Sequence, residues 1–369
     1  MSKIKKIYIL SGGTGGHVYP AKIMAEKFLL EEIEVVWIGT SRGPEKKIAE
    51  NLNIRFIKIP LSGFRGKSFF SKLKAFLAFL LTGLYFLVKI WPFKIFTKKR
   101  TPLIAFGGYV SLAAFFYFKG PVYLQEQNTI PGSVSRLLVS SKKIKKVFCG
   151  YKQTQNYFKK ISKEEDKIIL SGNPVSSNFH TLYKKNKNKF LQSIETKILI
   201  LGGSQGSKSL NLILPKALLN IEDLFIKHQC GKNNFEETEI IYQQYANNNK
   251  VEIIEYMDNI HEYYGWADII ICRAGALTVS EVSASGSLGI FIPLPWAIDN
   301  HQFFNAKHLK DLNAGFLLEE NDNLEQDLIK MLNDIKKIEI KKLQIMKENS
   351  YKAYIKNPEK KIYDEIAAI

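Results

Sequence analysis

Cysteine is scarce in this sequence. The 369 residues include three cysteines, Cys149, Cys230 and Cys272. Their odd number and wide spacing, without a Cys-x-x-Cys motif, exclude a disulfide framework and a structural zinc site. No secretory leader is expected, because the first apolar run, Ile7 to Leu10, is shorter than the roughly 7–15 residues of a signal-peptide core. These absences predict a cytoplasmic protein.

Long uncharged apolar runs are lacking as well. The most apolar segment is Phe69–Phe96, and its longest stretch without charge, Ala75–Val88, has fourteen residues. As a helix this stretch would be about 21 Å long, whereas the bilayer core is about 30 Å thick, which excludes a membrane span. Basic residues surround the segment at Lys67, Lys72, Lys74, Lys89, Lys94, Lys98, Lys99 and Arg100. An apolar surface ringed by lysines is typical of proteins that lie on an anionic leaflet, and a buried core helix is the alternative.

Acidic residues are outnumbered by basic ones. The chain has 35 Asp and Glu against 53 Lys and Arg, a formal net charge of +18. This excess favours an anionic partner, such as nucleic acid, an anionic membrane or a phosphorylated substrate, unless the lysines serve only as solubilising groups. The hydrophobic content of 46% is that of a folded protein, and 369 residues accommodate two domains.

Short apolar runs alternate with helical patterns along the chain. Strands are expected at Ile7–Leu10, Val35–Ile38, Ile54–Ile59, Leu103–Phe106, Val122–Leu124, Val147–Cys149 and Ile168–Leu170, and then at Ile198–Leu201, Phe225–Gln229, Val251–Ile254, Ile269–Cys272, Ile290–Pro293 and Phe316–Leu318. The alternation predicts an α/β fold whose parallel sheets are covered by helices on both faces. Gly172–Val175 reads as a turn between two similar halves, and residues 327–369 read as helix.

A glycine-rich loop follows the first strand of each half. The loops are Ser11-Gly-Gly-Thr-Gly-Gly-His17 and Gly202-Gly-Ser-Gln-Gly206. Such loops present backbone N–H groups to an anion such as a diphosphate. The first lacks the third glycine of a dinucleotide-binding motif, and the next strand ends without an acid, which argues against nicotinamide binding. The second has Ser207 in place of the second Walker A glycine, so a nucleotide triphosphatase stays an alternative.

Another strand, a tight turn and a helix occur near Arg273. The helix is expected to carry Thr278, Ser280 and Glu281 near its start. Hydroxyl and N–H groups at a helix start can hold a diphosphate, and the two oxygens of a glutamate can accept both hydroxyls of a ribose. A first-turn acid on a solvated helix is the alternative for Glu281. The segment Asp299–Asn305, which follows the next strand, favours the interpretation of Glu281 as a binding-site residue over that of a solvated first-turn acid.

Seven sequence blocks occur in a fixed order along the chain. They are Gly12-Gly-Thr-Gly-Gly-His17, Phe106-Gly-Gly-Tyr-Val-Ser111, Glu126-Gln-Asn128, Gly172-Asn-Pro-Val175, Gly202-Gly-Ser-Gln-Gly206, Arg273-x-Gly-Ala-Leu-Thr-Val-Ser-Glu281 and Gln302-x-x-Asn-Ala306. In these blocks the chain resembles the MurG family of bacterial glycosyltransferases over nearly its whole length. The resemblance implies the GT-B architecture, with two Rossmann-like domains whose parallel sheets face a central cleft. It also implies an inverting enzyme of peptidoglycan synthesis, hence of cell shape and division. Such enzymes transfer N-acetylglucosamine from its UDP donor to undecaprenyl-pyrophosphoryl-N-acetylmuramyl pentapeptide, converting lipid I to lipid II.

The resemblance further implies the domain boundaries. Residues 1–171 would form the domain that binds the acceptor and the membrane, with the C-terminal helix, about 352–369, crossing back onto it. Residues 172–351 would form the domain that binds the UDP-sugar.

Substrate-binding residues follow from the matching motifs. They are Thr14, Gly15, Gly16 and Asn128 in the first domain, and Ser204, Met257, Ala276, Leu277, Thr278, Val279, Ser280, Glu281 and Gln302 in the second. Two positions depart from the family. Gln125 stands where His is common, which removes a base, and Ser176 stands where Arg is common, which removes a positive contact to the donor.

Glycosyl transfer needs a base for the acceptor hydroxyl. His17 is the first candidate, because imidazole titrates near neutral pH and a helix dipole can tune it; a hydrogen bond that closes the loop is its alternative role. Glu126 is the second candidate, as a base or an orienting residue. The leaving diphosphate would be stabilised by N–H groups and helix starts. No Asp-x-Asp motif occurs, so neither a metal nor a cofactor is expected.

The expected partners are UDP-N-acetylglucosamine, the lipid-linked muramyl pentapeptide and the anionic cytoplasmic leaflet, which would contact the region Phe69–Arg100; nucleic acid is not expected. The expected location is peripheral, on the cytoplasmic face of the inner (plasma) membrane. A related glycosyltransferase with another lipid acceptor and a basic NTP- or nucleic-acid-binding protein stay open. Against the last, the lysines cluster beside an apolar run rather than along a groove with stacking aromatics.

Overall fold

The chain folds into two compact units. A computed structural model describes residues 4–61, 69–85, 101–189, 195–203, 206–244 and 250–368. Unit 1 comprises Met1–Pro174 and Ile355–Ile369, and unit 2 comprises Val175–Tyr354. The chain passes between the units after residues 174 and 354, each three residues beyond the boundaries expected at 171 and 351.

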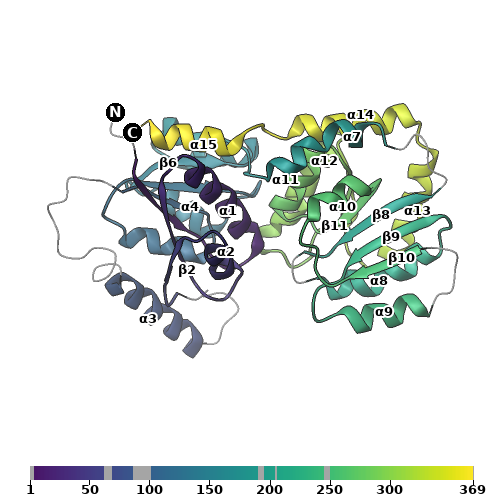
Figure 1. The fold of residues 1–369 in the computed structure, drawn as a ribbon, viewed down its shortest axis with the longest axis horizontal. Coiled ribbons are helices and arrows are strands. Elements are labelled where there is room, and N and C mark those ends of the chain that lie inside the picture. The colour runs from purple at the N-terminus through teal and green to yellow at the C-terminus, as the bar shows by residue number, and fades with distance from the viewer. Residues whose placement is uncertain are drawn as a thin grey trace. The chain divides into compact units, whose positions relative to one another are not determined.

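Unit 1 is a parallel sheet covered by helices (Figure 1). Its strands are β1 (Lys6–Leu10), β2 (Glu34–Gly39), β3 (Arg55–Lys58), β4 (Leu103–Ala105), β5 (Val122–Glu126), β6 (Ile144–Cys149) and β7 (Ile168–Leu170). Its helices are α1 (Gly15–Leu30), α2 (Glu45–Asn51), α3 (Phe69–Tyr85), α4 (Ser133–Val139), α5 (Lys152–Ile161) and α15 (Pro358–Ala367), with 3-10 turns η2 (Tyr109–Phe116) and η3 (Glu165–Lys167). In the described residues the strand order is β3-β2-β1-β4-β5-β6-β7.

Both faces of this sheet are buried. Along β1, Tyr8 and Leu10 belong to one apolar cluster, whereas Ile7 and Ile9 belong to another on the opposite face. Successive side chains of a strand point to opposite faces, so an uninterrupted apolar run is what a doubly covered parallel strand requires. The three cysteines are buried and free, as expected for those that end apolar strands.

The C-terminal helix α15 packs against unit 1 (Figure 1). Ile362 and Ile366 are fully buried in the same cluster as Ile7 and Ile9. Glu365 forms an ion pair with Lys146 of β6. The last residues therefore complete the core of the unit that the first residues begin.

Unit 2 repeats the pattern. Its strands are β8 (Thr196–Leu201), β9 (Leu224–Gln229), β10 (Lys250–Ile254), β11 (Ile269–Cys272), β12 (Leu288–Phe291) and β13 (Phe316–Leu317). Its helices are α6 (Ser177–Thr181), α7 (Tyr183–Lys187), α8 (Lys208–Leu219), α9 (Phe235–Gln243), α10 (Ile260–Trp266), α11 (Ala276–Ser285), α12 (His301–Asp311), α13 (Leu324–Lys337) and α14 (Ile340–Ala353), with the 3-10 turn η4 (Ile298–Asn300). Among the described residues the strand order is β10-β9-β8-β11-β12-β13, and every pairing is parallel. The alternation of strands and helices expected from the sequence is confirmed in both units.

One face of helix α3 packs against η2. Phe79 contacts Phe116, with ring centroids 4.7 Å apart, and a Cβ on Gly83 would lie 2.7 Å from the Phe116 ring. Thr82 is buried. Within the described ranges no helix is long and apolar enough to cross a membrane. The part of the apolar segment after Tyr85 lies outside the described residues, as do the side chains of the basic residues expected around it.

Candidate functional site

The predicted site residues gather at the carboxyl ends of the strands in each sheet. The strand order reverses between β1 and β4 in unit 1, and between β8 and β11 in unit 2. Open parallel sheets bind ligands at such switch points, because the loops of neighbouring strands diverge there. Each unit therefore carries its predicted residues where its topology favours a ligand.

Helix α1 begins on the first glycine-rich loop. Thr14 is its N-cap residue, and Gly15 and Gly16 form its first turn. Gly13 has a φ of 99°, in the left-handed region that favours glycine. His17 N and Val18 N both donate to Thr14 O, at 3.2 and 3.3 Å. The N–H groups of Gly15 and Gly16, which come before these bonds, have no acceptor within the helix and can bind an anion.

His17 lies at the same edge of unit 1. Its Nδ1 is 2.9 Å from Oε1 of Gln127. Its ring packs on the backbone of Gly107 and Gly108, where an added Cβ would approach ring atoms to 3.4 and 3.1 Å. Both glycines have positive φ, 73° and 66°. A backbone that only glycine adopts easily therefore brings the end of β4 against the imidazole.

Glu126, at the end of β5, is 1% exposed. Its Oε1 accepts hydrogen bonds from the backbone N and Nδ2 of Asn128, both at 3.1 Å. Its Oε2 accepts from the backbone N of Gly132 at 3.2 Å. A carboxylate committed to three donors is poorly suited to remove a proton, so the geometry favours Glu126 as the residue that orients Asn128.

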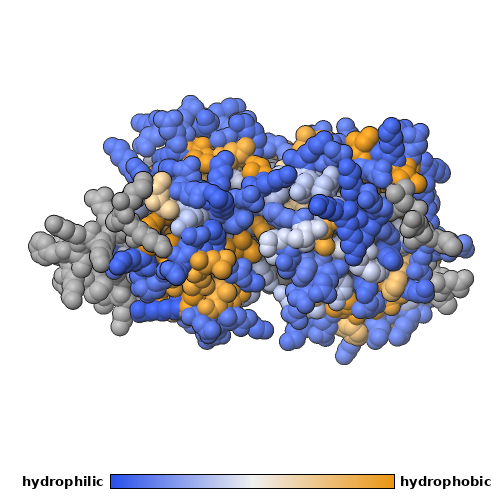
Figure 2. Space-filling view, turned by 45° about the horizontal axis from the view of Figure 1, so that its top comes forward, coloured by the Kyte–Doolittle hydropathy of each residue, from blue (hydrophilic) through white to orange (hydrophobic). Residues whose placement is uncertain are grey.

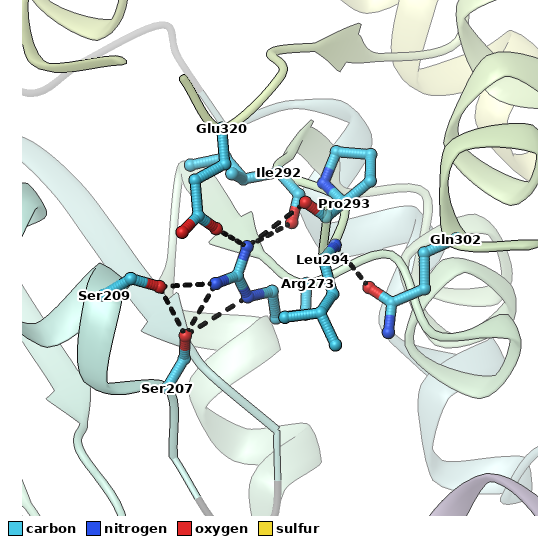
Figure 3. Close-up of polar contacts among 8 residues, drawn as sticks. All are labelled: Ser207, Ser209, Arg273, Ile292, Pro293, Leu294, Gln302 and Glu320. Carbon is cyan, nitrogen blue, oxygen red and sulfur yellow. Dashed lines mark hydrogen bonds and ion pairs between the residues drawn. The ribbon is translucent and has the colours of Figure 1, made fainter. Parts of the chain in front are cut away.

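In unit 2 a single buried arginine joins four loops (Figure 3). Arg273, after β11, donates from Nη2 to the hydroxyls of Ser207 and Ser209, at 2.8 Å each. Its Nη1 donates to the carbonyls of Ile292 and Pro293 after β12, at 3.2 Å each. Nη1 also lies 2.5 Å from Oε2 of Glu320, which follows β13. The ion pair is 7% and 14% exposed, so solvent screens it little.

Helix α11 places the predicted Ala276–Glu281 segment. Ala276, Leu277 and Thr278 form its first turn after the N-cap residue Gly275, and Ser280 Oγ bonds back to Ala276 O at 2.8 Å. Val279 is fully buried, so its side chain packs in the core. Its backbone N–H donates to Gly275 O at 3.0 Å, and the ligand contact expected at Val279 stays a prediction.

Glu281 is partly buried one turn further on. Its Oε2 accepts a hydrogen bond from the hydroxyl of Tyr264 at 3.1 Å. Burial raises the pKa of Glu281 to about 8, and the Tyr264 hydrogen bond lowers it. Because a solvated first-turn acid would keep its ordinary pKa, the surroundings favour a carboxyl prepared for a ligand.

Three predicted residues remain. Met257 is buried and its N–H donates to Gln229 Oε1 at 3.2 Å, which leaves the carbonyl for a ligand. Oε1 of Gln302 accepts from the N–H of Leu294 at 3.0 Å, so its amide nitrogen is turned the other way (Figure 3). Ser204 lies outside the described residues.

Gln125 and Ser176, the two positions that depart from the family, differ in their surroundings. Gln125 is completely buried and donates to Asn173 Oδ1 at 3.0 Å, so its side chain does not face a ligand. Ser176 is the N-cap residue of α6.

Sequence reasoning missed Gln127, Tyr264 and Glu320. Gln127 stands inside a quoted motif, so the motif could have indicated it. No local pattern marks Tyr264 or Glu320, since each reaches its partner only through the fold.

Comparison with known proteins identifies the family. The family model "Glycosyltransferase family 28 N-terminal domain" matches residues 7–168, and "Glycosyltransferase family 28 C-terminal domain" matches residues 197–366. The chain is 38% identical, over 99% of its length and 98% of the relative's, to the UDP-N-acetylglucosamine–N-acetylmuramyl-(pentapeptide) pyrophosphoryl-undecaprenol N-acetylglucosamine transferase of Francisella tularensis. The chain belongs to the MurG family. The transferase of the same name from Vesicomyosocius okutanii is 37% identical over 98% of this chain and 97% of its own.

A solved MurG family structure agrees with this. The crystal structure of Acinetobacter baumannii MurG matches 99% of this chain and 100% of its own, with a TM-score of 0.75 and 28% identity. The two parallel α/β units thus have the GT-B architecture of the MurG family, and the chain is a UDP-sugar-dependent glycosyltransferase.

Proposed function

We propose that this protein transfers N-acetylglucosamine from UDP-N-acetylglucosamine to undecaprenyl-pyrophosphoryl-N-acetylmuramyl pentapeptide, converting lipid I to lipid II in peptidoglycan synthesis. The observation that carries the proposal is the 38% identity to a transferase of that name over 99% of the chain. The placement of the family motifs at the carboxyl ends of both sheets supports it.

The donor occupies the α11 edge of unit 2 in this proposal. Glu281 accepts hydrogen bonds from the ribose hydroxyls, and the Met257 carbonyl lies toward the uracil. The diphosphate binds the N–H groups at the start of α11 and the loop after β8, including Ser204. Gln302 donates its amide N–H to the sugar. In unit 1, Thr14, Gly15, Gly16 and Asn128 are the residues proposed to bind substrate.

The reaction is a single inverting displacement. The acceptor hydroxyl oxygen forms a bond to the anomeric carbon of N-acetylglucosamine while the bond from that carbon to the diphosphate oxygen breaks. The acceptor proton passes to His17, and the electron pair of the broken bond leaves with UDP. Preorganised N–H groups at helix starts stabilise the charge that develops on the diphosphate.

Product analysis tests this function. Purified protein is incubated with UDP-N-acetylglucosamine and a lipid-linked muramyl pentapeptide analogue, and UDP and the glycosylated lipid are measured. We expect both in equal amounts, with a rate unchanged by EDTA. UDP release with a different lipid-linked sugar, but not with this acceptor, would indicate a related glycosyltransferase. Loss of activity in EDTA that magnesium restores would contradict metal independence.

The contacts of Arg273 with Ser207, Ser209 and Glu320 predict that a change at Glu320 lowers donor binding. Glu320→Gln keeps the shape of the side chain but leaves Arg273 without its counter-ion in a buried site. We expect the Arg273 hydrogen bonds to Ser207 and Ser209 to weaken and the affinity for UDP to fall about tenfold, measured by calorimetry.

A matched variant separates this from general destabilisation. Glu252→Gln removes the partner of Lys227, an ion pair of 2.6 Å between β10 and β9 in the same unit. It is expected to leave UDP affinity within about twofold of wild type. Equal losses in both variants would contradict a specific role for Glu320.

We also propose that helix α3 rests on the anionic cytoplasmic leaflet of the membrane, which would make the protein peripheral there. Leu77, Leu80, Leu81 and Leu84 are 51%, 48%, 56% and 57% exposed. Their spacing places them on one face of the helix, opposite the side that contacts Phe116. Figure 2 shows hydrophobic side chains exposed together on unit 1. Such an exposed apolar patch, in a segment whose sequence is flanked by lysines, supports membrane contact over a buried core helix.

Membrane binding predicts a charge-sensitive surface. Leu80→Glu places an anion on the apolar face, and we expect about a tenfold loss of binding to phosphatidylglycerol-containing vesicles in a sedimentation assay. Leu30→Glu is the control, because Leu30 is 81% exposed on α1. Equal binding of wild type and Leu80→Glu would refute the proposed contact.

A further inference from the structure

We propose that Gln127 is a positioning residue, which fixes His17 in the tautomer that carries its proton on Nδ1 and leaves Nε2 free to accept one. The inference rests on the proposed function for its consequence in catalysis, but the tautomer itself follows from the hydrogen-bond directions around Gln127.

The orientation of the Gln127 amide is set by its other contacts. Its Nε2 lies 3.0 Å from the carbonyl oxygen of Phe106. A backbone carbonyl only accepts hydrogen bonds, so the amide nitrogen must face Phe106 and the amide oxygen must face His17. Because Oε1 is an acceptor, the His17 Nδ1 atom 2.9 Å away must carry the proton. A neutral imidazole then has an unprotonated Nε2, the form that a general base requires.

A chain of buried amides holds Gln127 in this orientation. The Gln127 Nε2 also donates to Gln125 Oε1. Gln125 Nε2 donates to Asn173 Oδ1 at 3.0 Å, and Asn173 Nδ2 donates to the Gln127 backbone carbonyl at 2.9 Å. The three side chains are 0%, 1% and 2% exposed for Gln125, Gln127 and Asn173. Turning any one amide over would set donor against donor or acceptor against acceptor where water cannot compensate, so the directions are mutually fixed.

This network gives a role to the position where the chain departs from its family. Gln125, in place of the common His, both donates and accepts in the amide chain. It therefore acts on His17 through Gln127 rather than as a base of its own.

In the described residues, the carboxylates of two neighbouring elements form hydrogen bonds with groups other than His17, although Oε2 of Glu45 is buried there without a hydrogen bond. Glu45 of α2 accepts from Thr40 Oγ1 at 2.7 Å, and Glu126 of β5 accepts from Asn128 and Gly132. The hydroxyl of Tyr109, at the start of η2, lies 3.5 Å from Thr40 Oγ1. The partner of His17 Nδ1 is the neutral amide of Gln127. Replacing that amide by a carboxylate therefore adds one negative charge next to Nδ1.

Nitrogen-15 NMR of histidine-labelled protein tests the tautomer directly. The full-length wild-type protein at a pH where imidazole is neutral is expected to show His17 as the Nδ1–H form, assigned by its loss in His17→Ala. Gln127→Met removes the acceptor, and we expect a mixture of tautomers with a fall in kcat of about tenfold or more. A wild-type spectrum with His17 protonated on Nε2, or an unchanged tautomer in Gln127→Met, would overturn the proposal.

The pH profile gives a second measurement. Gln127→Glu places an anion beside Nδ1–H, which favours the imidazolium, so the acid limb of kcat/KM is expected to move up by about one pH unit. Gln155→Glu makes the same change on α5, where the amide donates to Ile168 O instead, and should leave the limb in place. An unmoved limb in Gln127→Glu would contradict the inference.

These outcomes distinguish the inference from the proposed function. If the wild-type protein transfers no N-acetylglucosamine, the proposed function fails while the NMR spectrum still decides the tautomer. The wild-type spectrum needs no Gln127 variant, so the test stands even where Gln127→Met does not fold.

Discussion

Replacing His17 by alanine is expected to lower kcat by about 1,000-fold, within the range that removal of a general base produces. The ring lies at the carboxyl edge of unit 1 beside the start of α1, where the predicted anion-binding N–H groups begin. The KM for UDP-N-acetylglucosamine should change little, because the donor is held mainly by unit 2 in the proposed arrangement.

Initial rates with both substrates varied give the two constants separately. His261→Ala is a suitable control, since His261 lies on α10 and contacts the ring of Phe179. It should keep kcat within about twofold. If His17→Ala also stays within about threefold of wild type, the imidazole closes the loop rather than removing a proton.

The second large effect is expected at Glu281. Glu281→Gln removes the charged acceptor proposed for the two ribose hydroxyls, and hydrogen bonds to charged groups contribute about 1.5–3 kcal/mol each. We expect the affinity for UDP-N-acetylglucosamine to fall about 50-fold at pH 8, measured by calorimetry. Retained affinity would mean that Glu281 stabilises the first turns of α11 rather than binding the ribose.

Donor affinity should also depend on pH through this carboxyl. Burial raises the pKa of Glu281 to about 8 in the ligand-free protein, so the ionised acceptor is a minority below that pH. Binding that requires ionisation releases a proton, and affinity should rise by up to about tenfold per pH unit as pH increases toward 8, then level off. Glu281→Gln should flatten this dependence.

Tyr264 offers a matched pair of variants. Its hydrogen bond lowers the pKa of Glu281, so Tyr264→Phe should raise that pKa and move the midpoint of the binding curve to higher pH. Tyr242→Phe removes a buried hydroxyl that bonds His228 Nδ1 at 3.0 Å instead. It should leave the midpoint unchanged, and an equal shift in both variants would contradict the role of Tyr264.

Stability gives an independent measurement of the same carboxyl. The pKa of Glu281 is raised in the folded protein, so the fold binds this proton more tightly than the unfolded chain. The stabilisation is complete below the ordinary pKa of about 4.5 and is lost as pH rises to about 8. The Tm of Glu281→Gln without ligand should therefore rise relative to wild type between these values, and a constant difference would argue against the raised pKa.

Local patterns in the chain were enough to predict the two α/β units, and the candidate site was proposed from patterns of the same kind. Doubly buried parallel strands need continuous apolar runs, and these runs predicted the strands of both sheets. The loop Ser11–His17 and the Ala276–Glu281 segment were predicted as binding elements because a loop that binds an anion leaves a local pattern of glycine and helix-start residues.

The partners of these residues could not be predicted from local patterns, because they come from distant parts of the chain. Gln127 meets His17 from 110 positions away, and Glu320 meets Arg273 after two further strands. The fold also brings three hydrogen-bond donors to the Glu126 carboxylate and buries the side chain of Val279. The physical reason is that tautomer, burial and ionisation depend on what surrounds a side chain in space, and distant strands supply those surroundings.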